Sequence, residues 1–511
     1  MTEQRSSKVV RNTVYNAIGR FWEIIVALFL SPYIIGHIGI ERFGIWALVS
    51  VLTGCFSLMD FGIRASFVRF IAEYHAKGDL DGVNRVVSTG FVFYCAMAVM
   101  MCAAGFLFVG PVINFLKISP GLRLEAQYVF VLGIVVFAIG SALSPVGALQ
   151  TGLQRMDVSS KISVALSIPN VVGTVIFLET GCGLPGLVVN NAVISVLTGA
   201  INFSAAHRIM PQFKFRPLTF DRGIFKKLFS FGYKIQITVW AGWINTQMVK
   251  VMLARFLGVS DVSFYSLAEN VVGKLKEVPL MLAYAVMPAA SELGAKTEID
   301  ALRSLYFRAM KYQALVLLPI AGGTLLLSRA FMTLWMGPGF EKAAVTMQIL
   351  MVGTVLNVLT SPGASVLIGI GKPQYAMWSA VIAIPVNLIL SVWLVVKMGY
   401  CGIPVAVAVS LGVSGIYYIA AAIRVINIPL REMALKVFLK PLAAAAFPFV
   451  MFYCFLPERA AAANWWAFAG TGFFYLLAYA CGVLVTKHFD EFDKVFAGRC
   501  FNSAAARIGR A

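Results

Sequence analysis

Long apolar blocks separated by short polar segments run through the chain from residue 14 to residue 486. A helix that crosses a hydrocarbon core of about 30 Å needs roughly 20 apolar residues. Strands of a membrane barrel are shorter and alternate in polarity, and these blocks do not. The seventh and eighth blocks contain charges and the thirteenth is short, so the pattern predicts twelve to fourteen spans. The predicted spans are 14–35, 43–63, 87–110, 126–149, 162–180, 186–206, 230–256, 261–288, 312–334, 344–370, 376–397, 402–423, 441–456 and 465–486.

Composition supports an all-α polytopic membrane protein. The 511 residues are 59% hydrophobic and 13% charged, about half the charged fraction of a soluble domain. The net charge of +19 would suggest nucleic acid in a soluble protein. With Arg255 and Lys397 at span ends assigned to the adjoining loops, 29 of the 42 Lys and Arg residues fall on the side of the termini, seven on the other side and six inside spans. This bias follows the positive-inside rule and predicts cytoplasmic termini, with no nucleic-acid partner.

An internal repeat predicts the architecture. The segment EYHAKGDLDGVNR begins at Glu73 and ELGAKTEIDALRS begins at Glu292, an offset of 219 residues, and Gly39 matches Gly258 at the same offset. Six spans separate the copies, so the copies run in the same direction. We therefore expect two pseudo-symmetric six-helix lobes related by an axis along the membrane normal.

The predicted organisation has five parts. An N-lobe covers residues 1–206, a basic cytoplasmic loop covers 207–229, and a C-lobe covers 230–425. Two further helices lie in 426–486, and a cytoplasmic tail follows at 487–511.

Charges inside predicted spans cost at least about 2.5–3.5 kcal/mol each on insertion scales, so each needs a reason. Eleven such charges occur if Arg255, Asp261 and Lys397 at the span edges are left out, and three of the eleven, Glu179, Lys234 and Arg329, lie near span ends where they can snorkel. The other eight belong to spans 1, 2, 7 and 8, the first two helices of each repeat. They are Arg20, Glu23, Asp60, Lys250, Glu269, Lys274, Lys276 and Glu277.

Helical spacing places these charges on polar stripes. The stripes are Asn12, Asn16, Arg20 and Glu23 in span 1; Ser50, Thr53, Ser57, Asp60 and Arg64 in span 2; Gln236, Trp240, Trp243, Gln247 and Lys250 in span 7; and Glu269, Asn270, Gly273, Lys274, Lys276 and Glu277 in span 8. Stripes of this kind do not face lipid, and together they predict a hydrated cavity between the lobes.

Structural explanations stand beside this interpretation. Arg20 with Glu23 and Lys274 with Glu277 are three residues apart and can pair within one helix. Trp240 and Trp243 could pack inside the protein or stack on a sugar ring of a ligand. Their alignment with the amide side chains of Gln236 and Gln247 slightly favours a contact with sugar. Asp60 with Arg64 is expected to cap the cytoplasmic end of span 2.

Catalytic motifs are absent from the sequence. The four His residues lie in or near separate loops, and no HExxH sequence, phosphate-binding loop or nucleophile elbow occurs. The sequence therefore predicts a transporter and no enzyme, with no cofactor and no metal site.

Five segments combine glycine with aromatic and apolar residues: FGIWALV from Phe43, LMDFGIRASFVRFIAEYHAKGD from Leu58, LWMGPGFEKAA from Leu334, LIGIGKPQYA from Leu367 and MGYCGIPVAVAVS from Met398. They resemble polysaccharide-exporting flippases of the multidrug/oligosaccharidyl-lipid/polysaccharide (MATE-like) superfamily, close to the O-antigen type. The resemblance covers roughly residues 10 to 425. It implies two six-helix lobes that open alternately to either side, with spans 1, 2, 7 and 8 lining the cavity, and two additional C-terminal helices.

The resemblance also implies a cargo. It would be an oligosaccharide on undecaprenyl pyrophosphate, moved from the cytoplasmic to the periplasmic leaflet of the bacterial inner membrane for O-antigen, capsule or exopolysaccharide assembly. Polysaccharide polymerase and chain-length proteins are the partners expected in such a pathway, and the polyprenyl tail would stay in membrane lipid, along spans 13 and 14.

Site residues follow by position in the spans. We expect Arg20, Lys250, Lys274 and Lys276 to bind pyrophosphate, Arg64 and Arg69 to lie at the cytoplasmic mouth, and Gln236, Trp240, Trp243 and Gln247 to contact the glycan. Glu23, Asp60, Glu269 and Glu277 are candidates for coupling to H⁺ or Na⁺ or for salt bridges.

Two related functions remain as alternatives. A multidrug cation antiporter of the same fold needs an acidic, aromatic cavity, whereas the deep charges of this chain have a net positive sum. Peptidoglycan-precursor flippases carry several Arg in spans 1 and 2, whereas this chain has one deep Arg in span 1 and none deep in span 2.

Overall fold

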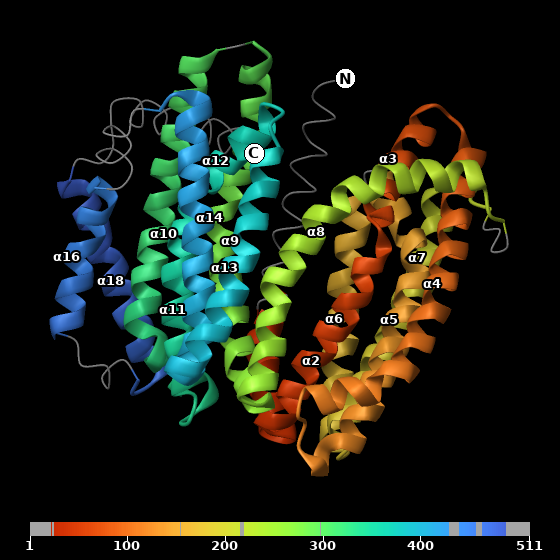
Figure 1. The fold of residues 1–511 in the computed structure, drawn as a ribbon, viewed down its shortest axis with the longest axis horizontal. Coiled ribbons are helices and arrows are strands. Elements are labelled where there is room, and N and C mark those ends of the chain that lie inside the picture. Colours follow the sequence, from red (N-terminus) through yellow and green to blue (C-terminus); the bar gives the residue numbers. More distant parts are fainter. Residues whose placement is uncertain are drawn as a thin grey trace, which may run out of the picture. The chain divides into compact units, whose positions relative to one another are not determined.

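The computed structural model describes Trp22 and residues 25–153, 155–214, 219–296, 298–428, 439–455 and 462–486. These residues form α-helices and short 3₁₀ turns joined by loops (Figure 1). The chain packs into two compact units, residues 1–266 and residues 267–511. The predicted all-α class is confirmed for the described part of the chain.

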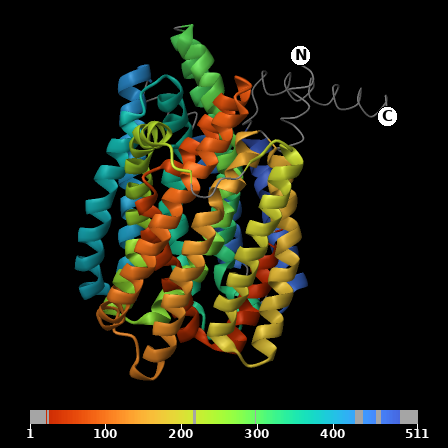
Figure 2. The same cartoon turned by 90° about the vertical axis from the view of Figure 1, so that its right-hand side faces the viewer.

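Unit 1 is built from long helices that run up and down beside one another. Figure 2 shows α4 to α7 side by side. The elements are a helix at Ile25–Ile38, α2 (Ile40–Ser57), η1 (Leu58–Asp60), α3 (Ile63–Ala76), α4 (Leu80–Phe115), η2 (Pro120–Leu122), α5 (Arg123–Gly152), α6 (Met156–Glu179), α7 (Gly183–Ile209), α8 (Arg222–Phe256) and the start of α9 (Val259–Ala295).

Unit 2 contains the rest of α9 and the helices that follow it. They are α10 (Ile299–Met336), α11 (Glu341–Leu359), α12 (Ser361–Gly369), α13 (Gln374–Met398), η3 (Gly399–Cys401), α14 (Gly402–Ile426), α16 (Lys440–Phe455) and α18 (Trp465–Val485). The last two pack against α10, where the Tyr479 hydroxyl donates to the Leu315 carbonyl at 3.1 Å. The expected spans 13 and 14 are therefore part of this unit.

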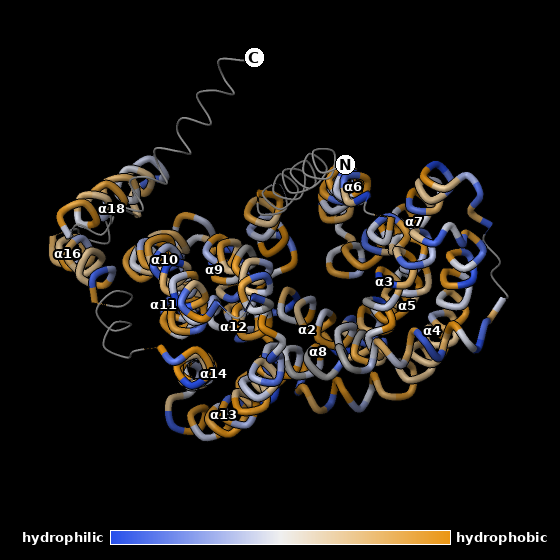
Figure 3. The backbone as a smooth tube through the Cα atoms, turned by 90° about the horizontal axis from the view of Figure 1, so that it is seen from above, coloured by the Kyte–Doolittle hydropathy of each residue, from blue (hydrophilic) through white to orange (hydrophobic). Residues whose placement is uncertain are grey.

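The helices match the predicted spans in position. Each predicted range from 43–63 onward overlaps a described helix, whereas much of 14–35 lies outside the described residues. Nine segments of the described chain are long and apolar enough to cross a membrane, and hydrophobic positions occur along all the labelled helices (Figure 3). The chain is thus a multi-pass membrane protein, and the count of fourteen spans stays a prediction. Helices α8 and α9 are not among the nine because polar and charged residues interrupt them.

Two predicted boundaries are wrong. Span 2 was expected as one helix over 43–63, but α2 ends at Ser57 and a separate helix, α3, continues to Ala76. The inter-lobe loop was expected to reach residue 229, but α8 begins at Arg222. Its start is fixed by Asp221, whose carboxylate accepts from the Gly223 and Ile224 amides at 2.8 and 3.0 Å, an N-cap.

The two copies of the repeat form the same local structure. In each copy a helix ends, a short turn follows and a new helix begins. The first copy has an ion pair between Lys77 and Glu73 at 2.6 Å, and the second has one between Lys296 and Glu292 at 2.9 Å. In both copies the lysine hydrogen bond lowers the pKa of the glutamate. Equivalent sequence positions therefore make equivalent contacts.

A buried cluster of aliphatic and aromatic side chains from α3, α4 and α5 holds unit 1 together. Phe67 of α3 is 0% exposed and packs against α4 at Gly90, where an added Cβ would lie 2.2 Å from the ring. The fit leaves no room for a residue larger than glycine at position 90.

We expect Phe67→Ala to lower the stability of the purified protein in detergent by about 3 kcal/mol, because a cavity remains where the ring packed. Phe106→Ala is the matched control, since Phe106 is 67% exposed on α4 and loses no internal packing. Thermal unfolding of both variants measures the difference. Equal destabilisation by the two substitutions would contradict the packing described here.

Candidate functional site

The second predicted span is interrupted between residues 58 and 62. After the 3₁₀ turn Leu58–Asp60, Phe61 has φ 50° and Gly62 has φ 70°. A left-handed φ is unfavourable for a bulky residue such as Phe and natural for Gly. The interruption leaves carbonyls of the preceding turn without their usual helical partners.

Helix α8 supplies donors to this interruption. The Leu58 carbonyl accepts hydrogen bonds from Gln236 Nε2 at 3.0 Å and from Trp240 Nε1 at 2.8 Å. Gln236 is only 3% exposed. In this structure, therefore, two of the four residues predicted to contact the glycan hold the broken span to α8, and their predicted glycan role is untested.

The backbones of the two segments also approach closely. A Cβ added to Gly62 would lie 2.1 Å from the Gly232 carbonyl oxygen, and one added to Gly232 would lie 2.5 Å from the Phe61 oxygen. One turn further along α3, the Ser66 hydroxyl donates to the Leu228 carbonyl of α8 at 2.8 Å. Small residues thus allow α8 to cross directly over the interruption.

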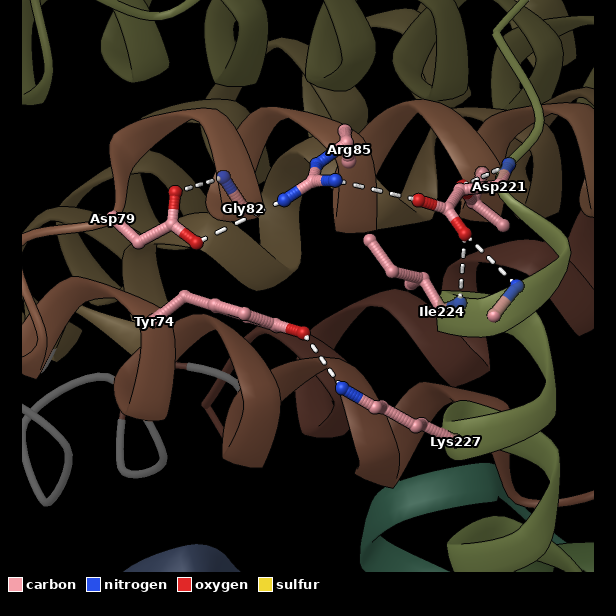
Figure 4. A network of polar contacts seen from close by, with 9 residues as sticks. Tyr74, Asp79, Gly82, Arg85, Asp221, Ile224 and Lys227 are labelled. Atoms are coloured by element: carbon pink, nitrogen blue, oxygen red, sulfur yellow. Dashed lines mark hydrogen bonds and ion pairs between the residues drawn. The ribbon is translucent and has the colours of Figure 1, made fainter.

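Figure 1 shows the consequence for α8, which starts beside α4, crosses over α3 and then turns to continue along α2. The start of this crossing is held by a polar network (Figure 4). Arg85 of α4 bridges Asp79 at 3.8 Å and Asp221 at 3.6 Å, and Lys227 contacts the Tyr74 hydroxyl at 3.4 Å. Asp79 and Asp221 are the N-caps of α4 and α8, so one arginine joins two helix starts.

Asp60 lies at the end of the 3₁₀ turn, and each of its two carboxylate oxygens accepts a hydrogen bond. The Tyr94 hydroxyl of α4 donates to Oδ1, and the Arg64 backbone amide donates to Oδ2 at 3.4 Å. The carboxylate therefore caps the first turn of α3. The expected contact between Asp60 and Arg64 at the end of span 2 is present, through the Arg64 backbone amide, and the cytoplasmic side of this end stays a prediction.

A cavity of about 420 Å³ opens beside Asp60, lined by residues of unit 1. Four members of the predicted span 2 stripe line it, namely Ser50, Thr53, Asp60 and Arg64, and the side chain of Ser57 lies outside the described residues. The other lining residues are Trp46, Val49, Tyr94, Met97, Gly133, Val136, Phe137, Gly140, Ser141, Ser144, Val188, Asn191 and Ser195.

The contributions of α5 and α7 to this cavity were not predicted from the sequence. On α5 the small residues Gly140, Ser141 and Ser144 leave the space, and on α7 Asn191 and Ser195 share one face. Ser141 and Ser144 are three residues apart and Asn191 and Ser195 are four apart, and this helical spacing was the sequence signal for a polar face on each helix. It is weak, because Ser and Asn can occur in membrane helices without a ligand.

The remaining two predicted glycan contacts also lie on α8. A Cβ added to Gly54 of α2 would lie 2.4 Å from Trp243 Nε1, so the indole packs on α2. Trp243 Nε1 and Gln247 Oε1 are buried and lack a hydrogen-bond partner within the described residues. Both side chains thus keep a polar atom for which a ligand hydroxyl is a suitable partner.

The predicted cationic residues fall in both units. Lys250 belongs to unit 1 and is 8% exposed, whereas Lys274 and Lys276 belong to unit 2. Lys274 Nζ lies 4.0 Å from Glu277 Oε1, which is the predicted pair within α9. Convergence of these lysines on one pyrophosphate stays a prediction.

The other predicted residues are placed as follows. Glu269 is half-buried and Lys276 and Arg64 are exposed. Arg69 of α3 lies over the Phe231 ring of α8 at 4.3 Å, a cation–π contact. Arg20 and Glu23 lie outside the described residues.

We expect Gly62→Ala to destabilise the protein by on the order of 2–3 kcal/mol, because the new methyl meets the Gly232 carbonyl and the left-handed φ is strained. Gly78→Ala separates the two effects, since Gly78 has φ 73° but nothing within 4 Å of an added Cβ. Thermal unfolding in detergent should show a clearly larger loss for Gly62. Equal losses would mean that the contact with α8 contributes nothing.

Comparison with known proteins gives a consistent family. Residues 9–294 match the family model described as "Polysaccharide biosynthesis protein". The chain is 24% identical to the "Putative O-antigen transporter" of Shigella flexneri, over 72% of this chain and 86% of that protein. It is 21% identical to the "Probable low-salt glycan biosynthesis flippase Agl15" of Haloferax volcanii, over 75% and 76%.

Solved structures share the fold at low sequence identity. "Lipid II flippase MurJ, inward closed conformation" aligns with a TM-score of 0.69 and 14% identity, over 94% of this chain and 98% of that one. An inward-facing multidrug resistance MATE family transporter aligns with a TM-score of 0.65 and 15% identity, over 81% and 94%. The predicted MATE-like fold class is confirmed by these similarities.

Proposed function

The chain belongs to the polysaccharide biosynthesis protein family, and from that membership we propose that it is a lipid-linked oligosaccharide flippase. The cargo is an oligosaccharide on undecaprenyl pyrophosphate, moved by alternating access from the cytoplasmic to the periplasmic leaflet for surface polysaccharide assembly. The relatives named as an O-antigen transporter and a glycan flippase support this proposal. The protein acts in the bacterial inner membrane with both termini in the cytoplasm, as a transporter and not as an enzyme.

The observation that carries the proposal is a polar cavity inside a unit of apolar, membrane-length helices. Asp60 and Arg64 line this cavity together with hydroxyl and amide side chains. Ionisable residues at membrane depth are costly and mark cargo or ion pathways. In a lipid-linked oligosaccharide, the part that needs such a pathway is the hydrophilic glycan, because the polyprenyl tail of the molecule remains in lipid.

Cationic residues are proposed to neutralise the pyrophosphate. Lys250 is held at 8% exposure on α8, and Lys274 and Lys276 follow on α9. In a partly dehydrated site, charge-assisted hydrogen bonds to phosphate oxygens are roughly twice as strong as neutral ones. Arg20, outside the described residues, completes the proposed set.

The interruption of span 2 is the proposed hinge, since hinge residues absorb large changes in φ and ψ at element ends. Phe61 and Gly62 already separate two helices there. Coupling to H⁺ or Na⁺ through Glu23, Asp60, Glu269 or Glu277 is proposed as the energy input.

We expect Lys250→Gln and Lys276→Gln each to reduce the initial rate of flipping by at least about tenfold, because a hydrogen bond to a charged phosphate is worth about 1.5–3 kcal/mol. Proteoliposomes that carry a fluorescent undecaprenyl-pyrophosphate oligosaccharide measure the rate. Lys117→Gln is the control, since Lys117 is exposed and lies outside the predicted spans. Wild-type rates in both test variants would remove the pyrophosphate assignment.

A drug panel tests the competing antiporter function. Cells that express the chain should show unchanged susceptibility to organic cations while they complement a strain that lacks its own flippase. Resistance to organic cations without complementation would favour a multidrug antiporter.

A further inference from the structure

The cavity of unit 1 combines aromatic surfaces with neutral hydrogen-bonding groups. Trp46, Tyr94 and Phe137 line it alongside Ser141, Ser144 and Asn191. We propose that this cavity binds one neutral pyranose ring of the cargo glycan. The proposal rests on the proposed function and gives the glycan a subsite on α2, α4, α5 and α7, apart from the predicted contacts on α8.

The size of the cavity fits a sugar ring. Pockets that hold small molecules measure about 300–1,000 Å³, and this one measures about 420 Å³. Asp60 is the one carboxylate among the lining residues, and most of the other polar lining groups are neutral hydroxyls and amides.

The chemistry of the lining fits a sugar. Serine hydroxyls and the asparagine amide both donate and accept hydrogen bonds, as sugar hydroxyls do. An indole or phenol ring offers an apolar face to the C–H groups of a pyranose. Ser141 and Ser144 are one helical turn apart on α5, and Asn191 lies on α7, so polar partners from two helices line the same space.

The charges of the lining favour a neutral ring. Asp60 and Arg64 sum to zero, and the Asp60 carboxylate already accepts from the Tyr94 hydroxyl and the Arg64 amide. No excess positive charge remains for a uronate or a pyrophosphate. The cavity therefore selects a neutral sugar, and the anionic part of the cargo is left to the lysines of α8 and α9.

Saturation-transfer NMR on the full-length protein in detergent tests the subsite directly. The probes are the methyl glycosides of glucose, galactose, mannose and N-acetylglucosamine, with methyl glucuronide as the matched anionic partner of the glucoside. We expect transfer to at least one neutral glycoside, and at most about one-tenth of that signal for the glucuronide, because no net positive charge in the lining offsets the cost of desolvating its carboxylate.

Two variants assign the signal to this cavity. Ser144→Leu fills part of it, and Asn191→Leu removes an exposed amide that lines it. Each should reduce transfer by about tenfold, while Ser204→Leu, an exposed serine elsewhere on α7, keeps the wild-type signal. Unfolding temperatures near the wild-type value identify which variants are folded.

The outcomes separate the inference from the proposed function when wild-type flipping is measured on the same preparation. Flipping without binding of any neutral glycoside, or binding that both folded variants retain, overturns the subsite while the flippase stands. Cavity-dependent glycoside binding in a protein that does not flip the lipid-linked oligosaccharide supports a sugar site and overturns the flippase.

Discussion

The hydrogen bonds that α8 donates to the Leu58 carbonyl are the contacts on which unit 1 depends. A bilayer offers no water to a broken helix, so the backbone groups freed by an interruption must find partners inside the protein. Gln236 and Trp240 provide them, and the glycine contact between residues 62 and 232 allows α8 close enough to do so. Without this arrangement the Leu58 carbonyl would have no partner from α8.

The break in turn creates the site. Because the chain leaves the helix at Leu58, Asp60 turns toward α4 and meets Tyr94, and its second oxygen caps α3. Ser50 and Thr53 of α2 then border the cavity, and Gly54, one turn after Ser50, packs against Trp243 of α8. A separation of α8 from α2 would expose the Leu58 carbonyl, so movement at this joint needs replacement partners. Cargo hydroxyls are chemically suited to that role.

Much of the fold followed from the sequence because length and hydropathy determine where a helix can cross a bilayer. The repeat could also be recognised in the sequence, since Glu73 and Lys77 recur at Glu292 and Lys296. In the structure both pairs form the same ion pair. The break could not be predicted from the sequence, because residues 43–63 form a predominantly apolar run with Gly62 near its end, and one glycine does not stop a membrane helix. The cavity was only half predicted, because Asp60 stood out by its charge, whereas the serines of α5 stood out only by spacing.

The distribution of charge completes the argument about cargo. A pyrophosphate-linked glycan has one strongly anionic part and one neutral, hydroxyl-rich part. A single positively charged site would bind the pyrophosphate and leave the neutral sugars without a site of their own. In unit 1 the charges beside the cavity cancel between Asp60 and Arg64, while Lys250 is buried on a different helix. Separate sites of different charge would orient the cargo as well as bind it. A flippase gains from this, because a fixed orientation keeps the lipid tail directed toward the bilayer while the head crosses.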